Sequence, residues 1–261
     1  KKPIHFSFTY DEETACQGAP IMLKELKKRN VKCSICIVGE PTSMKAVQAH
    51  KGCYEYSTYF TGLAGHGSAP DKGVNAVEYA SLYINKLMEL REELKKREPK
   101  NSVFIPPYST LQIGGIKGGL ARNVIADQCT VDWEMRPVIP EDGKFVTQNI
   151  EAYVKDFLLP KMRKVYPKAN IKKEIIGEII GFTKEEKSDA VNLVCNLTGD
   201  NSRDVVSFGT EAGLFQKLGI STVVCGPGSI EQAHTIDEYV SFDQLKLCLK
   251  MLIDLKEQIT N

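Results

Sequence analysis

Residues 53–62, CYEYSTYFTG, decide how this chain is divided. Their alternating pattern is typical of a β-strand with one buried face. The segment at residues 31–41, VKCSICIVGEP, contains instead a continuous apolar run of the kind found in parallel sheets. The change of pattern at Cys53 therefore marks the start of a second domain.

The residues that follow Cys53 predict a small α+β domain. A helix over residues 75–96 keeps one apolar face, formed by Val77, Ala80, Ile84, Leu87, Met88 and Leu94. Strands are predicted at 109–118, 128–138 and 170–180, and a second helix near 145–165. This β-α-β-β-α-β order indicates a ferredoxin-like layer with helices on one face.

Both flanks of this domain alternate strands and helices, which is typical of an α/β sheet. Before it we expect a strand at 3–10, a helix at 18–30 and a strand at 31–41. After it we expect helices at 188–197 and 211–219, strands at 204–210 and 221–227, and a last helix from Ser241, with Gln244 in capping-box spacing. The predicted fold class is therefore α/β, with a sheet domain in two pieces, 1–52 and 177–261, and an α+β ferredoxin-like satellite domain inserted at 53–176.

The composition is that of a globular protein with almost no net charge. Lys and Arg total 34 against 33 Asp and Glu among 261 residues, so a net charge of +1 gives no general attraction for nucleic acid or an anionic membrane. No apolar run approaches the roughly 20 residues of a membrane span. We therefore expect a cytoplasmic protein that binds neither nucleic acid nor membrane.

Neither the cysteines nor the glycine-rich segment indicates a redox or nucleotide-binding function. The eight cysteines are scattered through predicted strands and helices, so we expect them to be reduced. Cys33 and Cys36 have C-x-x-C spacing, but they lie in a predicted buried strand, which argues against a redox role. GGIKGG, residues 114–119, fits neither glycine-rich nucleotide motif, and we expect a flexible connection there.

Carboxylates gather where predicted strands end. FSFTYDEETACQGA, residues 6–19, places Asp11, Glu12 and Glu13 between a strand and a helix. Acids also suit the first turn of a helix, so these three alone leave a structural role open. Glu40 in IVGEPTSM and His234 in GPGSIEQAH follow other apolar strands, and ligands bind at the carboxyl edge of such sheets. Carboxylates with an imidazole indicate zinc or cobalt rather than calcium, and their crowding should raise at least one carboxyl pKa.

Five motifs follow one another along nearly the whole chain. They are TYDEETACQGA (9–19), IVGEPTSM (37–44), AGHGSAPDKGVNAVEYA (64–80), GGLARNVIADQCTVDWEMRP (118–137) and FGTEAGLFQKLGISTVVCGPGSIEQAHTIDEYV (208–240). Together they resemble the M20 family of di-metal peptidases and deacylases. The resemblance implies a catalytic domain that binds two zinc ions, with cobalt as an alternative, and a satellite domain that forms a homodimer.

The resemblance also implies roles for the acidic residues. Glu12 is expected to be the general base, Glu13 and His234 to bind one ion, and Glu40 to bind the other. A carboxylate that binds metal is a poor base because its lone pairs are engaged, so an unligated neighbour must accept the proton. Asp11 is expected to support the site or to cap the helix.

Further residues are implied in catalysis and substrate binding. His66 in GHGSAP is expected to reach across the dimer and help hold the developing oxyanion, although it also fits a turn between two glycines. Asn123 and Arg136 are expected to bind substrate, with Arg136 at an α-carboxylate, although Arg136 also fits the polar face of its strand. Gly209 and Thr210 are expected to offer backbone amides to the same carboxylate at a helix start.

The implied reaction is the metal-dependent hydrolysis of N-acetyl-L-ornithine to ornithine and acetate, a step of arginine biosynthesis. A succinyl-diaminopimelate desuccinylase or an aminoacylase would share the metal site, so the substrate stays open, and Glu211 is the acid expected near a distal ammonium. Members of the family also carry an N-terminal His-x-Asp segment and a bridging aspartate, and none of the four histidines here is followed by Asp two residues later.

We therefore expect the catalytic domain to be incomplete at its N-terminus. As a 261-residue polypeptide, the chain should bind zinc weakly, be inactive and associate through the satellite domain. The alternative is a shortened, non-catalytic paralogue that dimerises or binds amino acids.

Overall fold

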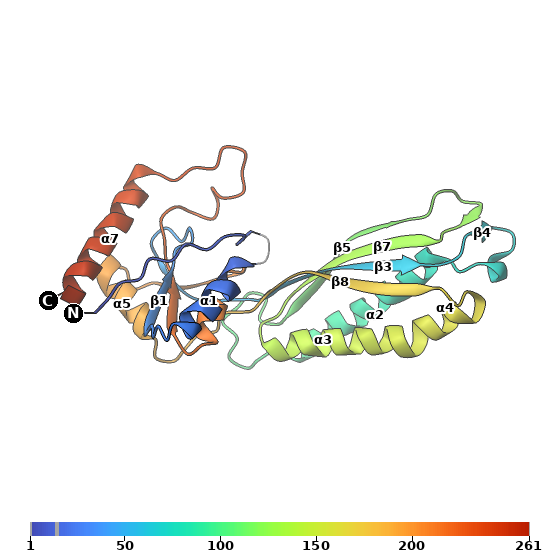
Figure 1. Cartoon of the computed structure of the whole chain (residues 1–261), viewed down its shortest axis with the longest axis horizontal. Helices are drawn as coiled ribbons and strands as arrows, with labels where there is room; N and C mark the ends of the chain where they lie inside the picture. Colours follow the sequence, from blue (N-terminus) through green and yellow to red (C-terminus); the bar gives the residue numbers. More distant parts are fainter. Residues whose placement is uncertain (1, 14–15, 261) are drawn as a thin grey trace. The chain divides into compact units, whose positions relative to one another are not determined.

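The computed structural model describes residues 2–13 and 16–260, and the chain forms two compact units (Figure 1). Unit 1 consists of Lys1–Lys51 and Ile179–Asn261, and unit 2 consists of Gly52–Glu178. The mixed α/β fold class predicted from the sequence is confirmed, because a sheet covered on both faces and a sheet with helices on one face are both present.

A four-stranded sheet forms the centre of unit 1. Its strand order is β1 (Ile35–Val38), β10 (Ser221–Val224), β2 (Ala46–His50) and β9 (Arg203–Val206). The pairs β1–β10 and β2–β9 are parallel, whereas β10 and β2 are antiparallel and meet where Val224 lies opposite Val47. The sheet is therefore two parallel pairs joined along one antiparallel seam.

Helices cover both faces of this sheet (Figure 1). One face packs against α5 (Asp189–Thr198) and α7 (Phe242–Thr260), and the other against α1 (Gly18–Lys28) and α6 (Ala212–Gln216). Val223 belongs to the first core and its neighbour Val224 to the second, because successive strand residues point to opposite faces. No helix in the described part of the chain is long and apolar enough to cross a membrane.

The strand predicted at residues 3–10 is wrong. Residues 2–9 have no regular secondary structure, and the side chains of Phe6 and Phe8 are 68% and 92% exposed. A strand needs a neighbour for its backbone hydrogen bonds, and no strand within residues 2–13 and 16–260 pairs with this segment. Alternation of aromatic and small residues is therefore not sufficient to make a strand here.

Strand β2 was not predicted. Its sequence, AVQAH, is short and contains the polar residues Gln48 and His50. It therefore shows neither the apolar run nor the alternation that would predict a strand. It is nevertheless central in the sheet, and four of its five residues are buried.

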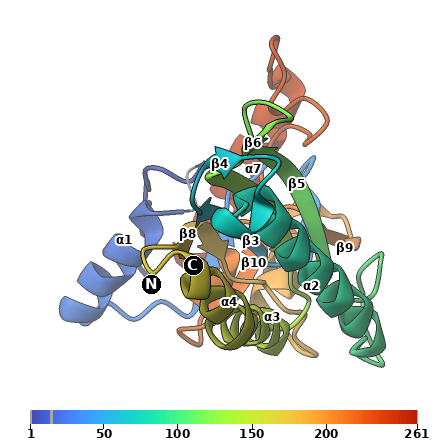
Figure 2. The same ribbon diagram turned by 90° about the vertical axis from the view of Figure 1, so that its right-hand side faces the viewer.

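Unit 2 contains a four-stranded sheet with helices on one face. The strand order is β5 (Thr110–Gly118), β7 (Gln128–Arg136), β3 (Cys53–Thr61) and β8 (Asn170–Ile179). The helices are α2 (Ala76–Lys96), α3 (Pro140–Tyr153) and α4 (Leu159–Val165), with a π-helical turn η2 (Val154–Leu158) between the last two (Figure 2). Two short strands, β4 (Gly65–His66) and β6 (Val124–Ile125), pair with each other, and the turn η1 (Pro70–Lys72) follows β4.

Two expectations for unit 2 need correction. The predicted flexible connection at residues 114–119 is mostly strand, since β5 pairs with β7 up to Gly118 opposite Cys129. A Cβ atom at Gly118 would lie 2.8 Å from the Cys129 sulfur, so this glycine allows the close approach of β7. The second helix begins at Pro140 rather than near residue 145, because proline suits the first position of a helix.

Buried polar contacts hold the core of unit 2 in register. Trp133 Nε1 donates to Thr58 Oγ1 over 3.1 Å, and that hydroxyl donates to Tyr83 OH over 3.1 Å. In the first turn of α3, Asp142 is fully buried, and the Nε of Arg97 lies 2.7 Å from its Oδ1. Each of these buried groups therefore has a partner, as a well-packed core requires.

Candidate functional site

Four glutamates and a histidine of unit 1 form what we call the acidic group: Glu12, Glu13, Glu40, Glu211 and His234. Glu40 comes directly after β1, and His234 lies in the loop after β10. Glu12 and Glu13 precede α1, and Glu211 precedes α6. Glu40, Glu211 and His234 thus follow strands of the sheet, at the edge where open α/β sheets bind ligands, whereas Glu12 and Glu13 follow a segment without regular secondary structure.

Glu13 and His234 lie side by side. His234 Nε2 is 3.5 Å from Glu13 Oε2, and both side chains are exposed. The backbone of His234 has φ of 59°, a left-handed conformation that is uncommon for histidine, and its N–H donates to Glu238 Oε2 over 3.2 Å. The loop therefore turns sharply at the histidine and presents its ring to Glu13.

Glu40 is the most perturbed carboxyl of the group. Burial, followed by the negative charges of Glu12, Glu13 and Glu211, raises its pKa to about 7, while His234 acts in the opposite direction. The prediction that crowding raises at least one carboxyl pKa is confirmed. These acids therefore lie close enough to repel one another, and a positive charge among them would relieve that repulsion.

Glu12 lies in a turn of the backbone. Asp11 has φ of 53°, and Cys16 N–H donates to the Glu12 carbonyl over 2.9 Å, so extended alternation ends at Asp11. Burial raises the Glu12 pKa, and the hydrogen bond that Cys16 Sγ donates to its Oε1 over 3.5 Å lowers it. Capping of the helix by Asp11 is not observed, because Gln17 occupies the N-cap of α1.

Glu211 is the most buried member of the acidic group, with only 6% of the residue exposed. Its Oε2 accepts a hydrogen bond from Thr9 Oγ1 over 3.0 Å. Its Oε1 is buried without a hydrogen-bond partner among the described residues. Burial raises the Glu211 pKa. This oxygen is therefore available to a donor from a ligand.

Thr210, next to Glu211, is fully buried. Its Oγ1 lies 3.0 Å from His50 Nε2 and accepts from Ala212 N–H over 3.1 Å. The hydroxyl is thus engaged within the protein, which leaves only the backbone of Gly209 and Thr210 for the expected ligand binding.

The predicted site residues of unit 2 fall into two places. His66 on β4 and Asn123 beside β6 are neighbours, since Gly67 N–H donates to the Asn123 carbonyl over 2.8 Å. His66 is exposed, and its Nδ1 lies 2.7 Å from Ser68 Oγ. Arg136 lies at the far end of β7, eight residues beyond Gln128, or roughly 26 Å at the rise of a strand. The fold of unit 2 therefore does not bring Arg136 to His66 and Asn123.

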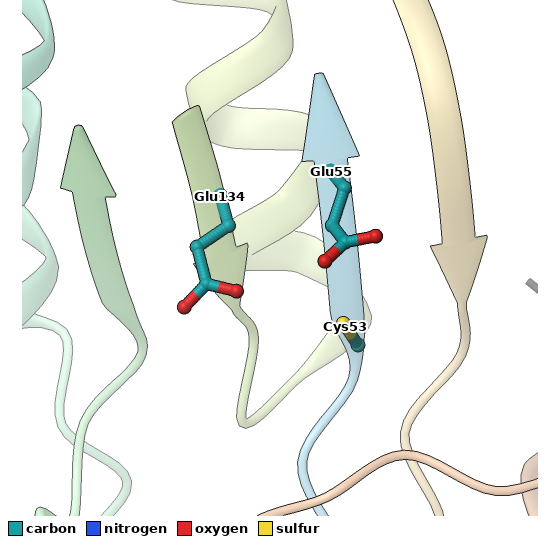
Figure 3. Close-up of side chains that lie close together, drawn as sticks. All are labelled: Cys53, Glu55 and Glu134. Atoms are coloured by element: carbon teal, nitrogen blue, oxygen red, sulfur yellow. The ribbon is translucent and has the colours of Figure 1, made fainter. Parts of the chain in front are cut away.

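A separate cluster on the sheet of unit 2 was not predicted: Cys53, Glu55 and Glu134 (Figure 3). One ligand atom from each lies within 4.8 Å of the others, and among the described residues no other set of three metal-binding side chains comes as close. Glu55 and Glu134 face each other across β3 and β7, a pairing that only the strand register reveals.

This cluster already contains a cation. Arg136 forms an ion pair with Glu134, with Nη2 2.9 Å from Oε2. Burial raises the pKa of Cys53 to about 11, so its thiol keeps its proton at neutral pH. The guanidinium therefore supplies the positive charge that the two carboxylates need, and we read the cluster as an ion-pair network.

The comparisons with known proteins agree with the two-unit fold. A peptidase dimerisation domain matches residues 48–162, most of which lie in unit 2. Residues 48–162 are therefore similar to the dimerisation domain of M20 peptidases, which agrees with the resemblance to the M20 family.

Over most of its length the chain is similar to acetylornithine deacetylases. That of Buchnera aphidicola subsp. Acyrthosiphon pisum is 36% identical over 92% of this chain and 60% of its own length. That of Shigella sonnei is 34% identical over 98% of this chain and 64% of its own length. The chain thus spans less than two thirds of these relatives. Among solved structures, a tripeptidase from Staphylococcus aureus shares the fold, with a TM-score of 0.68 and 21% identity over 94% of this chain and 61% of that one.

Proposed function

We propose that this chain is the larger part of a metal-dependent hydrolase that cleaves the amide bond of an N-acylated amino acid. The observation that carries the proposal is the acidic group of unit 1, in which Glu13 lies 3.5 Å from His234, and burial together with the neighbouring acids raises the pKa of Glu40 to about 7. A perturbed carboxyl pKa beside other titratable groups is typical of functional sites.

The donors of the acidic group fit a divalent metal. Carboxylates with one imidazole suit zinc, with cobalt as a second candidate. Glu13 and His234 would hold one ion and Glu40 would hold the other. Among the described residues these three do not place three ligand atoms within 4.8 Å of one another, so further ligands or a movement of the His234 loop would complete the sites. When bound, the metal would polarise the amide carbonyl and acidify water.

Glu12 is proposed as the general base. It is the half-buried member of the Asp11–Glu13 turn, and its raised pKa makes it a better proton acceptor than an exposed carboxylate. It takes a proton from the attacking water and returns it to the leaving amine nitrogen. His66, exposed on β4, would donate to the developing oxyanion from the partner of a dimer.

We propose N-acetyl-L-ornithine as the substrate, with ornithine and acetate as products in arginine biosynthesis. The names of the related deacetylases support this choice. The α-carboxylate would be bound by the backbone of Gly209 and Thr210. Arg136 and Asn123, also expected to bind substrate, lie at opposite ends of β7, and Arg136 is paired with Glu134, so the two would not hold one carboxylate within a single subunit. The distal ammonium would meet Glu211, whose buried Oε1 has no partner among residues 2–13 and 16–260.

A homodimer through unit 2 is part of the same proposal. The peptidase dimerisation domain at residues 48–162 supports it, and an exposed His66 is free to serve a neighbouring subunit. We propose a cytoplasmic location, as for other enzymes of amino-acid synthesis. Sedimentation of the 261-residue chain at several concentrations tests the dimer, and a monomer at high concentration would contradict it.

The roles of the two adjacent glutamates can be separated by experiment. Glu12→Gln should keep the bound zinc and lower turnover of N-acetyl-L-ornithine by roughly two to four orders of magnitude, since it removes the base alone. Glu13→Gln should lose zinc as well as turnover. Glu25→Gln, on the exposed face of α1, is the matched control and should change neither.

Turnover is measured on the protein as its gene encodes it, and zinc stoichiometry is also measured on the 261-residue chain. Equal loss of zinc and turnover in Glu12→Gln would make Glu12 a ligand and contradict its role as base. A preference for succinyl-diaminopimelate over N-acetyl-L-ornithine would contradict the proposed substrate but not the proposed mechanism.

A further inference from the structure

A hydrogen-bonded chain links the Gly209–Glu211 segment to the end of strand β2. His50 is the last residue of β2, and its ring lies between the carbonyl of Lys51 and the hydroxyl of Thr210. The Nδ1–O distance is 2.8 Å and the Nε2–Oγ1 distance is 3.0 Å. His50 and Thr210 are 1% and 0% exposed, so water does not compete for these contacts.

The partners determine where each hydrogen lies. A carbonyl oxygen can only accept, so Nδ1 of His50 carries the proton and donates to Lys51. Burial lowers the His50 pKa to about 4, so the ring is neutral and Nε2 is an acceptor at neutral pH. The Thr210 hydroxyl must then donate to Nε2, and its lone pair accepts from Ala212 N–H over 3.1 Å.

The ring itself is held by the fold. The backbone of His50 exchanges hydrogen bonds with Phe182, over 2.8 Å and 3.0 Å, and the two rings are 5.7 Å apart between centroids. The ring therefore presents Nε2 from a fixed position in a strand to a loop.

The Gly209–Glu211 loop, at the other end of the hydrogen bonds from His50, carries proposed ligand-binding groups. Thr210 lies between Gly209, whose backbone would meet the substrate carboxylate, and Glu211, whose Oε1 is unpartnered among the described residues. Glu211 in turn accepts from Thr9, three residues before Glu12. A rotation of the Thr210 side chain would release the loop from His50, and it would disturb both neighbours.

We propose that His50, in its Nδ1-protonated tautomer, is a positioning residue that holds the Gly209–Glu211 loop in its substrate-binding conformation through the Thr210 hydroxyl. The inference rests on the proposed function for what the loop binds, but not for the tautomer or for the coupling of His50 to the loop. His50 acts through Thr210 and contacts no substrate.

Two substitutions of His50 separate its two hydrogen bonds. The amide oxygen of glutamine reaches the place of Nε2, so His50→Gln keeps an acceptor for Thr210. The shorter asparagine places its amide at Nδ1, so His50→Asn keeps the donor for Lys51 and leaves the Thr210 hydroxyl without an acceptor. Thr210→Val removes the hydroxyl and keeps the shape of the side chain.

Two measurements on the 261-residue chain do not depend on turnover. A long-range ¹H–¹⁵N NMR spectrum of the histidine rings should show His50 as the Nδ1–H tautomer. Backbone amide shifts of residues 209–212 should move in His50→Asn and in Thr210→Val, and should stay near wild type in His50→Gln. An Nε2–H tautomer, or amide shifts that are alike in His50→Asn and His50→Gln, would overturn the proposal.

Kinetics on the protein as its gene encodes it add a second test. In His50→Asn we expect KM to rise about 3- to 10-fold, the range for one lost hydrogen bond, while kcat changes less. In His50→Gln the KM should stay near the wild-type value. The double variant His50→Asn with Thr210→Val should have a KM no higher than that of the more impaired single variant. Additive effects, or a fall in kcat alone, would overturn the positioning role. If wild type shows no turnover, the proposed function fails, and the NMR measurements still decide the fate of this inference.

Discussion

Burial of His50 should make the stability of unit 1 depend on pH, and the size of the effect follows from its environment. The ring is 1% exposed, and burial lowers its pKa from 6.5 to about 4. Between these two values the unfolded chain binds a proton that the folded chain does not. The free energy of unfolding therefore falls as the pH falls from above 6.5 towards 4.

The magnitude comes from the gap between the two pKa values. Each pKa unit corresponds to about 1.36 kcal/mol, so the whole effect is about 3 kcal/mol, of which about 2 kcal/mol is lost between pH 8 and pH 5. Glu40 acts in the opposite direction, because its pKa is raised from 4.5 to about 7 and the folded state takes up its proton first as the pH falls. The two contributions partly cancel in wild type.

The assay therefore compares wild type with His50→Gln, so that the contribution of Glu40 cancels. Urea unfolding is followed at pH 8, 6.5 and 5 by far-UV circular dichroism, because the single tryptophan, Trp133, lies in unit 2 and its fluorescence reports that unit. The advantage of wild type over the variant should shrink by about 2 kcal/mol on going to pH 5. Gln48→Ala, on the same strand, should differ from wild type by a constant amount. A pH-independent difference for His50→Gln would refute the reasoning.

Two further predictions concern the core of unit 2 and are measured by urea unfolding with Trp133 fluorescence. Arg97→Met should cost about 3 kcal/mol, because it leaves the fully buried Asp142 carboxylate without its cation, and adding Asp142→Asn should recover part of the loss; no recovery would contradict this. Thr58→Val should cost about 1–3 kcal/mol, because the buried Trp133 Nε1–H and Tyr83 hydroxyl lose their shared partner; a neutral effect would contradict it.

Local patterns predicted the elements whose burial is decided by their own sequence. In β7 the buried residues are Cys129, Val131, Trp133 and Met135, which alternate with polar residues along the chain. The apolar face predicted for α2 likewise packs in the core of unit 2, except for Met88, which is 41% exposed. Such elements bury one face against a single neighbouring layer, so their periodicity carries the information.

Contacts between distant parts of the chain could not be predicted in the same way. Residues 3–10 have the alternation of a strand but no strand partner among the described residues, and β2 has a partner on each side without the pattern. Strand register brings Glu55 opposite Glu134. The bond between His50 and Thr210 joins residues 160 positions apart. In each case, the local sequence of the two segments does not predict that they pair.

The candidate site was predicted in part. Glu13 and His234 were expected to meet, and they lie 3.5 Å apart, although the strand predicted before Glu13 is absent from the described structure, so the strand-end argument holds only for His234. The burial of Glu211, with one unpartnered oxygen in the described structure, depends on the packing of α6 and Thr9 and has no local signature. Their catalytic and binding roles stay predictions.

The insertion of unit 2 into unit 1 determines the order in which the chain can fold on the ribosome. Strand β1 ends at Val38, but its parallel neighbour β10 begins only at Ser221, so the first half of the unit 1 sheet emerges long before its partners. Unit 2 is continuous from Gly52 to Glu178 and contains its own core. A nascent chain arrested shortly after unit 2 has emerged should therefore protect that unit from protease while residues 1–51 are still cut, because long-range pairing must wait for the second piece to be synthesised.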